Sequence, residues 1–417
     1  MVKRVLLFLI LLSLSITGNA FSQIKLPDIT GPIVQQLPIM VPDLASVGAS
    51  DPKGTEFAEV VRNDLRNAAL FEVGSSGTIG DLNNINFASF FEAGAEYLIA
   101  GQYQSSGGRI KLAVRLFNVK EQKPILGRTY EASGGRVREA AHRFSDLVMK
   151  QLTGKNGFFT SKIAFVLGSK NKRNLFLMDY DGHDIKQLTR HGSLITSPHC
   201  SPNGKKIVFN SDKVWDQDLY IVDLGSKVSE KRLTRAFKLE QSPEWSPSGS
   251  QIAYSANGDI YVANANGKGA RNITRTYAID VSPTWSPDGS KIAFVSDRGG
   301  SPGIYVMNSS GSNVRKISSG GYSTDPSWSH SPEVNKIAFV KVGSGTNIYT
   351  VNPDGSGEQR LTGSGKNENP AWSPDGNYIA FSSTRDGAKN IYIMYKGGEN
   401  QRPLSKGGGK SYPTWCR

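Results

Sequence analysis

The 417-residue sequence is poor in the residues from which many metal and catalytic centres are built. It contains five histidines, none of which forms a metal-ligand spacing with another, and only two cysteines, Cys200 and Cys416. Beyond the first 20 residues it has no apolar run that approaches a transmembrane helix. Its 45 glycines and 20 prolines fall at regular turns, so it also lacks low-complexity tracts. The length suggests one to three folded domains.

The first 20 residues have the pattern of a signal peptide. Lys3 and Arg4 precede an apolar stretch, residues 5–16, and Gly18-Asn-Ala20 offers a cleavage site. At about 12 residues the apolar stretch is too short to span a bilayer comfortably. No cysteine follows the site, so a lipid anchor is not expected. We therefore expect an exported, soluble protein that begins at Phe21 after cleavage.

Charge is unevenly distributed along the chain. Residues 21–155 carry 15 Lys and Arg against 14 Asp and Glu, whereas residues 156–417 carry 32 against 22. The simplest interpretation is a solvated basic surface. An acidic partner is the alternative, and nucleic acid is not expected because the chain has an export signal and lacks a recognition motif.

The N-terminal part is predicted to be a small α/β domain preceded by an arm. Residues 21–35 show no sustained period and contain two prolines, so we interpret them as extended. Between residues 36 and 155, periods typical of strands and of helices follow one another. Strands are expected near 36–44, 70–73, 96–103, 109–119 and 124–132, and helices near 51–69, 87–93 and 136–152.

A motif of the form P-x-W-S-P-D-G recurs through the rest of the chain. Its tryptophan position is occupied at intervals of 40 to 45 residues by Cys200, Trp245, Trp285, Trp328, Trp372 and Trp415. All but the last are followed by three short strands, which is typical of a four-stranded propeller blade. The strands at 162–189 have no motif before them, and the last motif, 413–415, has no strands after it. We therefore predict a six-bladed β-propeller over residues 156–417, closed by the C-terminal strand.

The loops divide into a plain and a variable face. The S-P-D-G turns nearly repeat, whereas the loops just before each motif differ, and variation at fixed positions is typical of a binding surface. Trp215, in another loop of that face, is either a contact anchor or folded onto its own hairpin. The predicted contact residues are Thr196, Trp215, Leu239, Glu240, Gln241, Ser242, Ile279, Asp280, Val281, Tyr322, Thr324, Asp325, Asn367, Glu368, Asn369 and Tyr412.

Other chemical signals have structural interpretations. The G-x-S-x-G match at 299–303 lies in a hairpin loop rather than in a nucleophile elbow. His142 and Asp146 are one helical turn apart and are expected to form a hydrogen-bonded pair, and Asp179–Gly182 is expected to be a turn. Cys200 and Cys416 fall on neighbouring innermost strands, where a disulfide is possible if their side chains face each other. No catalytic residue, metal or cofactor is predicted.

The signal peptide, the α/β domain and the six repeats together resemble the TolB family of the Tol–Pal system. The junction, R-E-A-A-H-R-F-S-D at 138–146 followed by L-T-G-K-N-G at 152–157, is the most specific part. The resemblance implies a periplasmic, non-enzymatic monomer without a cofactor, which contacts membranes only through partners.

The same resemblance implies two partners and a role at the cell envelope. The propeller would bind the peptidoglycan-associated lipoprotein Pal, and the arm would bind TolA. The complex would support outer-membrane invagination at division and envelope integrity. The arm residues concerned are Phe21, Ser22, Gln23, Ile24, Lys25, Leu26, Pro27 and Asp28.

Two departures from the pattern and two alternatives remain. Cys200 replaces a tryptophan, and the turn after Trp328 is longer than in the other repeats. The alternatives are a hydrolase or metal-dependent lactonase that uses the propeller's central opening, and a protein that binds peptidoglycan directly through exposed aromatic side chains.

Overall fold

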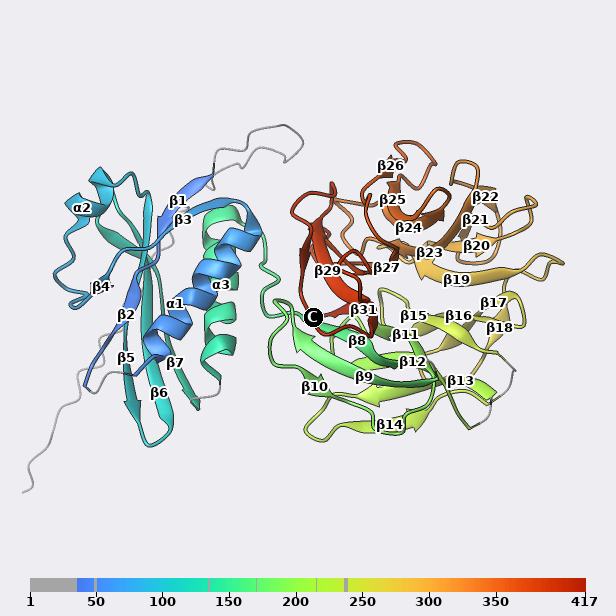
Figure 1. Cartoon of the computed structure of the whole chain (residues 1–417), viewed down its shortest axis with the longest axis horizontal. Helices are drawn as coiled ribbons and strands as arrows, with labels where there is room; N and C mark the ends of the chain where they lie inside the picture. The colour runs from blue at the N-terminus through green and yellow to red at the C-terminus, as the bar shows by residue number, and fades with distance from the viewer. Residues whose placement is uncertain (1–35, 49–50, 134–135, 170, 215, 236–238) are drawn as a thin grey trace, which may run out of the picture.

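The computed structural model describes residues 36–417 except 49–50, 134–135, 170, 215 and 236–238. It consists of an α/β domain beside a ring of six sheets (Figure 1). The predicted signal peptide, the arm and Trp215 lie outside the described residues. None of the described helices is long and apolar enough to cross a membrane.

The N-terminal domain is built on one mixed sheet. Strands β1 and β2 both pair in parallel with β5. They lie end to end along it and are separated by Val41-Pro42. Strands β6 and β7 extend the sheet as antiparallel neighbours. The strands are β1 (Leu37–Met40), β2 (Asp43–Ser46), β3 (Phe71–Gly74), β4 (Thr78–Ile79), β5 (Tyr97–Ser106), β6 (Arg109–Asn118) and β7 (Lys123–Ser133).

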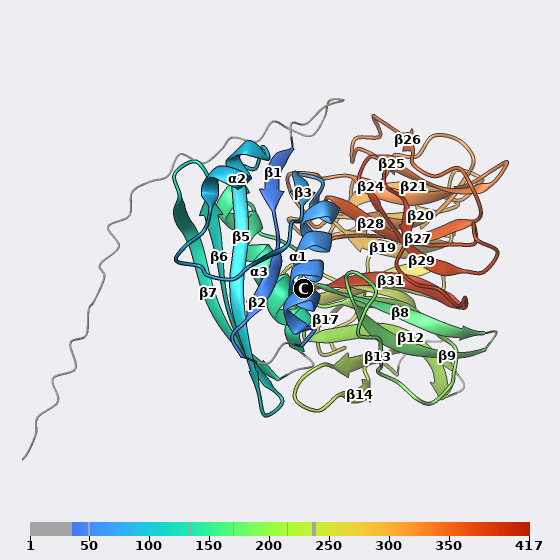
Figure 2. The same ribbon diagram turned by 60° about the vertical axis from the view of Figure 1, so that its left-hand side comes forward.

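Two long helices lie between this sheet and the propeller (Figures 1 and 2). They are α1 (Lys53–Ala68) and α3 (Val137–Thr153), and each buries the apolar stripe that its 3.6-residue period predicts. Phe57 of α1 and Phe144 of α3 meet in the core with ring centroids 6.2 Å apart. A short helix, α2 (Phe87–Glu92), is associated with a smaller apolar cluster. The predicted helices and strands of this domain are confirmed to within a few residues, except that the strand predicted at 36–44 is divided into β1 and β2 and that β4 was not predicted.

The propeller has six antiparallel four-stranded blades, as predicted. We number them in chain order, from the innermost strand outward. Blade 1 contains β31 (Lys410–Cys416), β8 (Lys162–Ser169), β9 (Lys172–Asp179) and β10 (Lys186–Gln187). Blade 2 contains β11 (Ile195–Cys200), β12 (Lys206–Val214), β13 (Asp216–Asp223) and β14 (Ser229–Arg232), and blade 3 contains β15 (Gln241–Trp245), β16 (Gln251–Ala256), β17 (Asp259–Asn264) and β18 (Arg271–Asn272).

The remaining blades repeat this order. Blade 4 contains β19 (Asp280–Trp285), β20 (Lys291–Ser296), β21 (Gly303–Asn308) and β22 (Arg315–Lys316). Blade 5 contains β23 (Tyr322–Trp328), β24 (Ile337–Val342), β25 (Thr346–Val351) and β26 (Gln359–Arg360). Blade 6 contains β27 (Asn367–Trp372), β28 (Tyr378–Ser383), β29 (Asn390–Tyr395) and β30 (Arg402–Pro403).

The recurring motif builds the scaffold in every blade. Trp285 and Trp328 are almost fully buried in the apolar clusters of the propeller. In the turn that follows Trp285, Asp288 accepts hydrogen bonds from the Ser286 hydroxyl and the Ser290 backbone, which lower its pKa to about 2. Gly289 has φ +71°, a conformation that favours glycine. Asp288 therefore satisfies polar groups of its own turn.

The junction between the domains corrects one prediction. His142 and Asp146 do not pair with each other, because each is engaged by a segment distant in sequence. Asp146 accepts hydrogen bonds from the backbone of Phe159 at 2.8 Å and from the hydroxyl of Thr160 at 2.6 Å, which fixes the chain where it enters the propeller. His142 instead contacts Asp64 on α1.

The N-terminal domain packs against the plain face of the ring, at blades 1 and 6. Phe158 packs against Tyr378 with the rings tilted and their centroids 4.6 Å apart, and it lies edge-on to Trp415 of β31. The hydroxyl of Tyr395 donates a hydrogen bond to the carbonyl of Asn67 at 3.1 Å. These propeller residues lie at the ends of strands next to the repeating turns, so the variable face remains on the other side.

Ring closure generates the first prediction. Cys200 of β11 and Cys416 of β31 are joined by a disulfide in the structure, with Cα atoms 5.2 Å apart and a sequence separation of 216. We predict that the protein purified without reductant is two hydrogens lighter by intact mass than its reduced form. Replacing both cysteines by serine should lower the stability by about 2–4 kcal/mol, because the unfolded chain loses a cross-link.

Thermal unfolding of the oxidised, reduced and Cys200→Ser/Cys416→Ser proteins measures this effect. The reduced protein and the double variant should unfold at similar temperatures, both below the oxidised protein. Two free thiols in protein purified from an oxidising compartment without reductant would contradict the prediction.

Candidate functional site: the mouth of the propeller channel

A backbone irregularity recurs at the same place in all six innermost strands. In each, the strand register shifts just before the motif proline, which forms a β-bulge. The residue before that proline has a left-handed backbone with φ between 49° and 53°. Bulges and non-glycine residues of this kind gather at functional sites. These bulge residues are Ser197, Ser242, Ser282, Asp325, Asn369 and Tyr412.

The six bulge residues surround the opening of the central channel on the variable face. All six line one cavity of about 120 Å³. A neighbouring hollow of about 400 Å³ shares Asp325, Asn369 and Tyr412 with it and adds the cations Arg173 and Lys389. Lys389 forms an ion pair with Glu368, whereas no ion pair joins Arg173 to a described acidic residue. The mouth therefore offers hydroxyls, amides and charges of both signs at the centre of the face.

Inside the mouth, side chains of one blade accept hydrogen bonds from the next. Glu244 accepts from the backbone N–H of Trp285 at 2.8 Å, and Thr284 accepts from that of Trp328 at 2.9 Å. His199 accepts from the backbone N–H of Trp245 at Nδ1, 3.3 Å away, so in its neutral form Nε2 carries the proton. Nε2 then points toward Glu244, 3.6 Å away.

The pKa values of His199 and Glu244 argue against a charged catalytic dyad. Burial lowers the pKa of His199 to about 3 and raises the pKa of Glu244 to about 8. At neutral pH both groups are therefore mostly uncharged, and each is held by backbone amides. Their geometry explains a connection between neighbouring blades rather than proton transfer.

A serine, histidine and glutamate also meet at the edge of this face, which bears on the hydrolase alternative. Ser193 Oγ is 2.7 Å from His191 Nδ1, and His191 Nε2 is 3.3 Å from Glu230. However, the backbone N–H that follows Ser193, a natural oxyanion donor, is bonded to the carboxylate of Asp212 at 2.7 Å. An acceptor occupies the place where a developing negative charge would need a donor. This arrangement does not support acyl transfer.

Large apolar side chains are exposed around the mouth. Leu239, Ile279 and Tyr322 are 58%, 57% and 49% exposed, and Tyr277 is fully exposed. Leu239, Tyr277 and Ile279 occupy the loops that precede the innermost strands of blades 3 and 4, and Tyr322 is the first residue of β23 in blade 5. Val214 and Val342 are also exposed at hairpins of the same face. Exposed apolar side chains gathered on one face are typical of a protein-binding surface, where aromatic residues often contribute most of the affinity.

Most of the predicted contact residues are accessible at this face. Leu239, Ile279 and Tyr322 are exposed. The half-buried ones are Thr196, Gln241, Ser242, Val281, Thr324, Asp325, Glu368, Asn369 and Tyr412. Sequence reasoning did not select Tyr277, Val214 or Val342, although an aromatic residue two positions before Ile279 in a polar loop was an available signal.

Three predicted contact residues are corrected, because their side chains are buried supports of the loops. Asp280 is held by the guanidinium of Arg298 at 2.9 and 3.0 Å. Asn367 accepts a hydrogen bond from Arg385 at 2.9 Å. Glu240 is fully buried next to the Thr234 hydroxyl, and burial raises its pKa to about 7. These residues shape the surface without being part of it.

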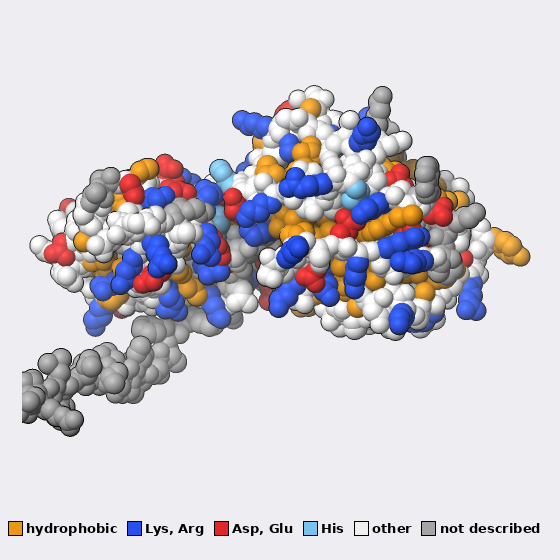
Figure 3. Space-filling model, turned by 90° about the horizontal axis from the view of Figure 1, so that it is seen from below, with side chains coloured by type: hydrophobic (Ala, Val, Ile, Leu, Met, Phe, Trp, Pro, Cys, Tyr) orange, Lys and Arg blue, Asp and Glu red, His pale blue; other side chains and the backbone are white. Residues whose placement is uncertain are grey.

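Basic side chains are dispersed on the one side of the molecule that is seen from below (Figure 3). Figure 3 shows Lys and Arg side chains dispersed over the side seen from below, between apolar and acidic ones. The net balance therefore does not by itself locate a partner. The apolar side chains and the bulges give the more specific indication.

Comparison with known proteins places these features in a family. Residues 149–417 match the model of the TolB beta propeller domain, and residues 27–125 match that of the TolB amino-terminal domain. A crystal structure of TolB from Acinetobacter baumannii superposes with a TM-score of 0.78 at 25% identity, covering 95% of this chain and 98% of that one.

Curated relatives are similar over a shorter region. The Tol-Pal system protein TolB of Geobacter metallireducens is 38% identical over 214 residues, which are 50% of each chain. That of Desulfotalea psychrophila is 32% identical over 227 residues, covering 52% of this chain and 51% of the relative. The chain thus spans about half the length of the curated relatives it matches. The matching propeller model alone covers more than half of the sequence. The chain therefore belongs to the TolB family of Tol–Pal system proteins.

Proposed function

We propose that this protein is a non-enzymatic periplasmic scaffold that binds the lipoprotein Pal through the variable face of its propeller. The observation that carries the proposal is the set of exposed apolar side chains around the channel mouth, on the face that the N-terminal domain leaves open. Leu239, Tyr277, Ile279 and Tyr322 can supply the apolar anchors, and the half-buried bulge residues can supply polar contacts.

The second part of the proposal concerns the N-terminal arm. We infer that residues 21–28, which precede the α/β domain, bind TolA. Because the propeller site and the arm belong to different parts of the chain, one molecule could engage both partners. Such a link would support outer-membrane invagination at division and the integrity of the envelope.

The propeller site is tested by replacing two of its exposed apolar side chains with charged ones. Leu239→Asp and Ile279→Asp, combined in the mature protein, should weaken capture by immobilised Pal of the same organism by at least about 30-fold. The factor follows from the loss of two apolar side chains that would be buried in the complex, each contributing around 1–2 kcal/mol to binding. Titration of bound protein against concentration gives the dissociation constant of each variant.

A matched control is available in the same propeller. Ile185 is 49% exposed but lies in the turn between β9 and β10, next to the plain face. Ile185→Asp should therefore leave capture by Pal unchanged. If the double variant is folded, as judged by circular dichroism and thermal unfolding, and still binds Pal like the wild type, the site assignment fails.

The arm is tested by deletion. Removing residues 21–28 should abolish capture by the periplasmic part of TolA and leave the dissociation constant for Pal within about twofold. Surface plasmon resonance with both partners measures the two affinities on one preparation. Retained binding to TolA would show that the contact lies elsewhere, without affecting the propeller assignment.

A further inference from the structure

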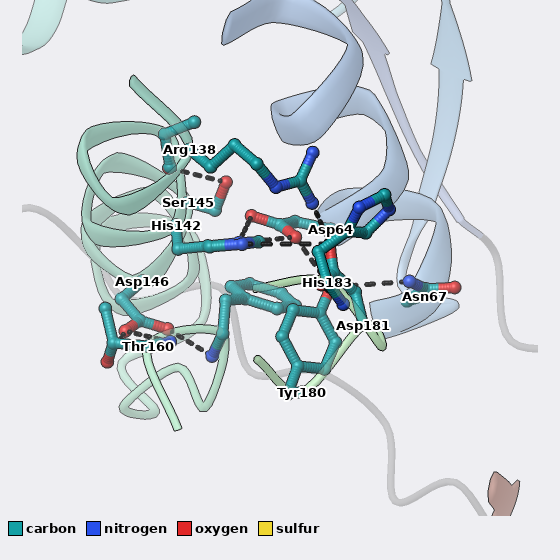
Figure 4. A network of polar contacts seen from close by, with 12 residues as sticks. Asp64, Asn67, Arg138, His142, Ser145, Asp146, Thr160, Tyr180, Asp181 and His183 are labelled. Carbon is teal, nitrogen blue, oxygen red and sulfur yellow. Dashed lines mark hydrogen bonds and ion pairs between the residues drawn. The ribbon is translucent and has the colours of Figure 1, made fainter. Parts of the chain in front are cut away.

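A group of buried polar side chains lies between the two domains (Figure 4). Asp64 comes from α1 and His142 from α3, whereas Tyr180 and Asp181 come from the propeller turn between β9 and β10. Asp64 and Tyr180 are fully buried, and His142 is 3% exposed. Buried polar groups of this kind need partners, so the protonation of each one follows from its neighbours.

Asp64 determines that the Nδ1 atom of His142 carries a proton. His142 Nδ1 is 3.0 Å from both carboxylate oxygens of Asp64, which accept hydrogen bonds when ionised. Nδ1 therefore carries a proton and donates it. The Tyr180 hydroxyl donates to the same carboxylate at 2.6 Å, and burial raises the pKa of Tyr180 well above its ordinary value. Asp64 thus orients the imidazole and also receives a hydrogen bond from the other domain.

The second ring nitrogen faces another carboxylate across the domain boundary. His142 Nε2 is 3.7 Å from Asp181 and is buried without a hydrogen-bond partner. A lone pair on Nε2 would face negative charge, whereas a proton there would be attracted to it. Burial lowers the pKa of His142, but the hydrogen bond and charge of Asp64, with the charge of Asp181, outweigh burial and raise the pKa above 6.5.

The neighbouring charges favour a proton over a metal ion in this position. His142, Asp179 and Asp181 place potential ligand atoms within 4.8 Å of one another. However, Lys162 pairs with Asp179 at 2.5 Å, and Arg138 pairs with Asp181. With His142 protonated, three cationic side chains balance Asp64, Asp179 and Asp181. Of the other groups nearby, Asp146 is bonded to the entering chain and His183 is exposed.

We propose that protonated His142 is an ionic link between the two domains, so that their contact weakens when His142 loses its proton. The imidazolium is held by Asp64 on its own domain and attracts Asp181 on the propeller. Because the pKa is raised in the docked state, the stabilisation is fully present below about pH 6.5 and is lost as pH rises through the raised value. Each unit of pKa elevation corresponds to an approximately tenfold change in docking between these limits.

The link is tested by titrating histidines in the full mature chain by NMR, between about pH 5.5 and 9. His142 should titrate above 6.5, and Asp181→Asn should lower its pKa because one of the two carboxylates is removed. Asp64 stays intact in this variant, so the imidazole keeps its orienting partner. His183→Gln is the matched control, and it should leave the titration of His142 unchanged.

Domain docking is followed by hydrogen exchange of residues 158–161 and 179–184, corrected for the intrinsic effect of pH. Exchange in the wild type should increase about tenfold per unit of pKa elevation as pH rises, and His142→Gln should remove this dependence. A His142 pKa at or below 6.5 would overturn the proposal. So would a pH dependence that survives in His142→Gln or in Asp181→Asn, or a titration that disappears on adding zinc alone.

Discussion

The structure depends on the pairing of the C-terminal strand β31 with β8, the first strand of the propeller. Lys410 pairs with Leu167 and Cys416 with Lys162, so the last strand supplies the inner edge of the first blade. Without it, blade 1 would expose a sheet edge to the channel. The same strand contributes Tyr412 to the mouth, Trp415 to the contact with Phe158, and Cys416 to the disulfide. Ring closure, the channel mouth and the domain contact therefore share one seven-residue strand.

The two faces of the ring differ in structure, and the sequence motif explains the difference. The repeated turns on the plain face satisfy their own polar groups, as Asp288 does, and leave regular surfaces against which the N-terminal domain packs. Toward the other face, each motif proline lies at a bulge, where the register of the innermost strand shifts before the pairing resumes. The loops before the bulges can then differ in length and composition without changing the register of the blades.

Local patterns predicted the fold well, because strand periods, turn residues and a 40- to 45-residue repeat are read from neighbouring positions. The prediction failed where partners are distant in sequence. His142 contacts Asp64, 78 residues away, rather than Asp146 on its own helix. Asp280 was predicted to be a contact residue on the surface, but its side chain is buried and accepts hydrogen bonds from the guanidinium of Arg298 in the following hairpin. A polar residue in a variable loop can either support the loop or form its surface, and only the packing distinguishes the two.

Ring closure by β31 also constrains the order of folding. The N-terminal domain contains all its own strands and can form as soon as its residues are available, whereas blade 1 waits for residues 410–416. Contacts between positions as distant as Cys200 and Cys416 are slow to form because a long loop must close first. During that interval the edge of β8 lacks its neighbour and can pair with other chains. The folding chain is therefore most exposed to aggregation just before its last strand pairs.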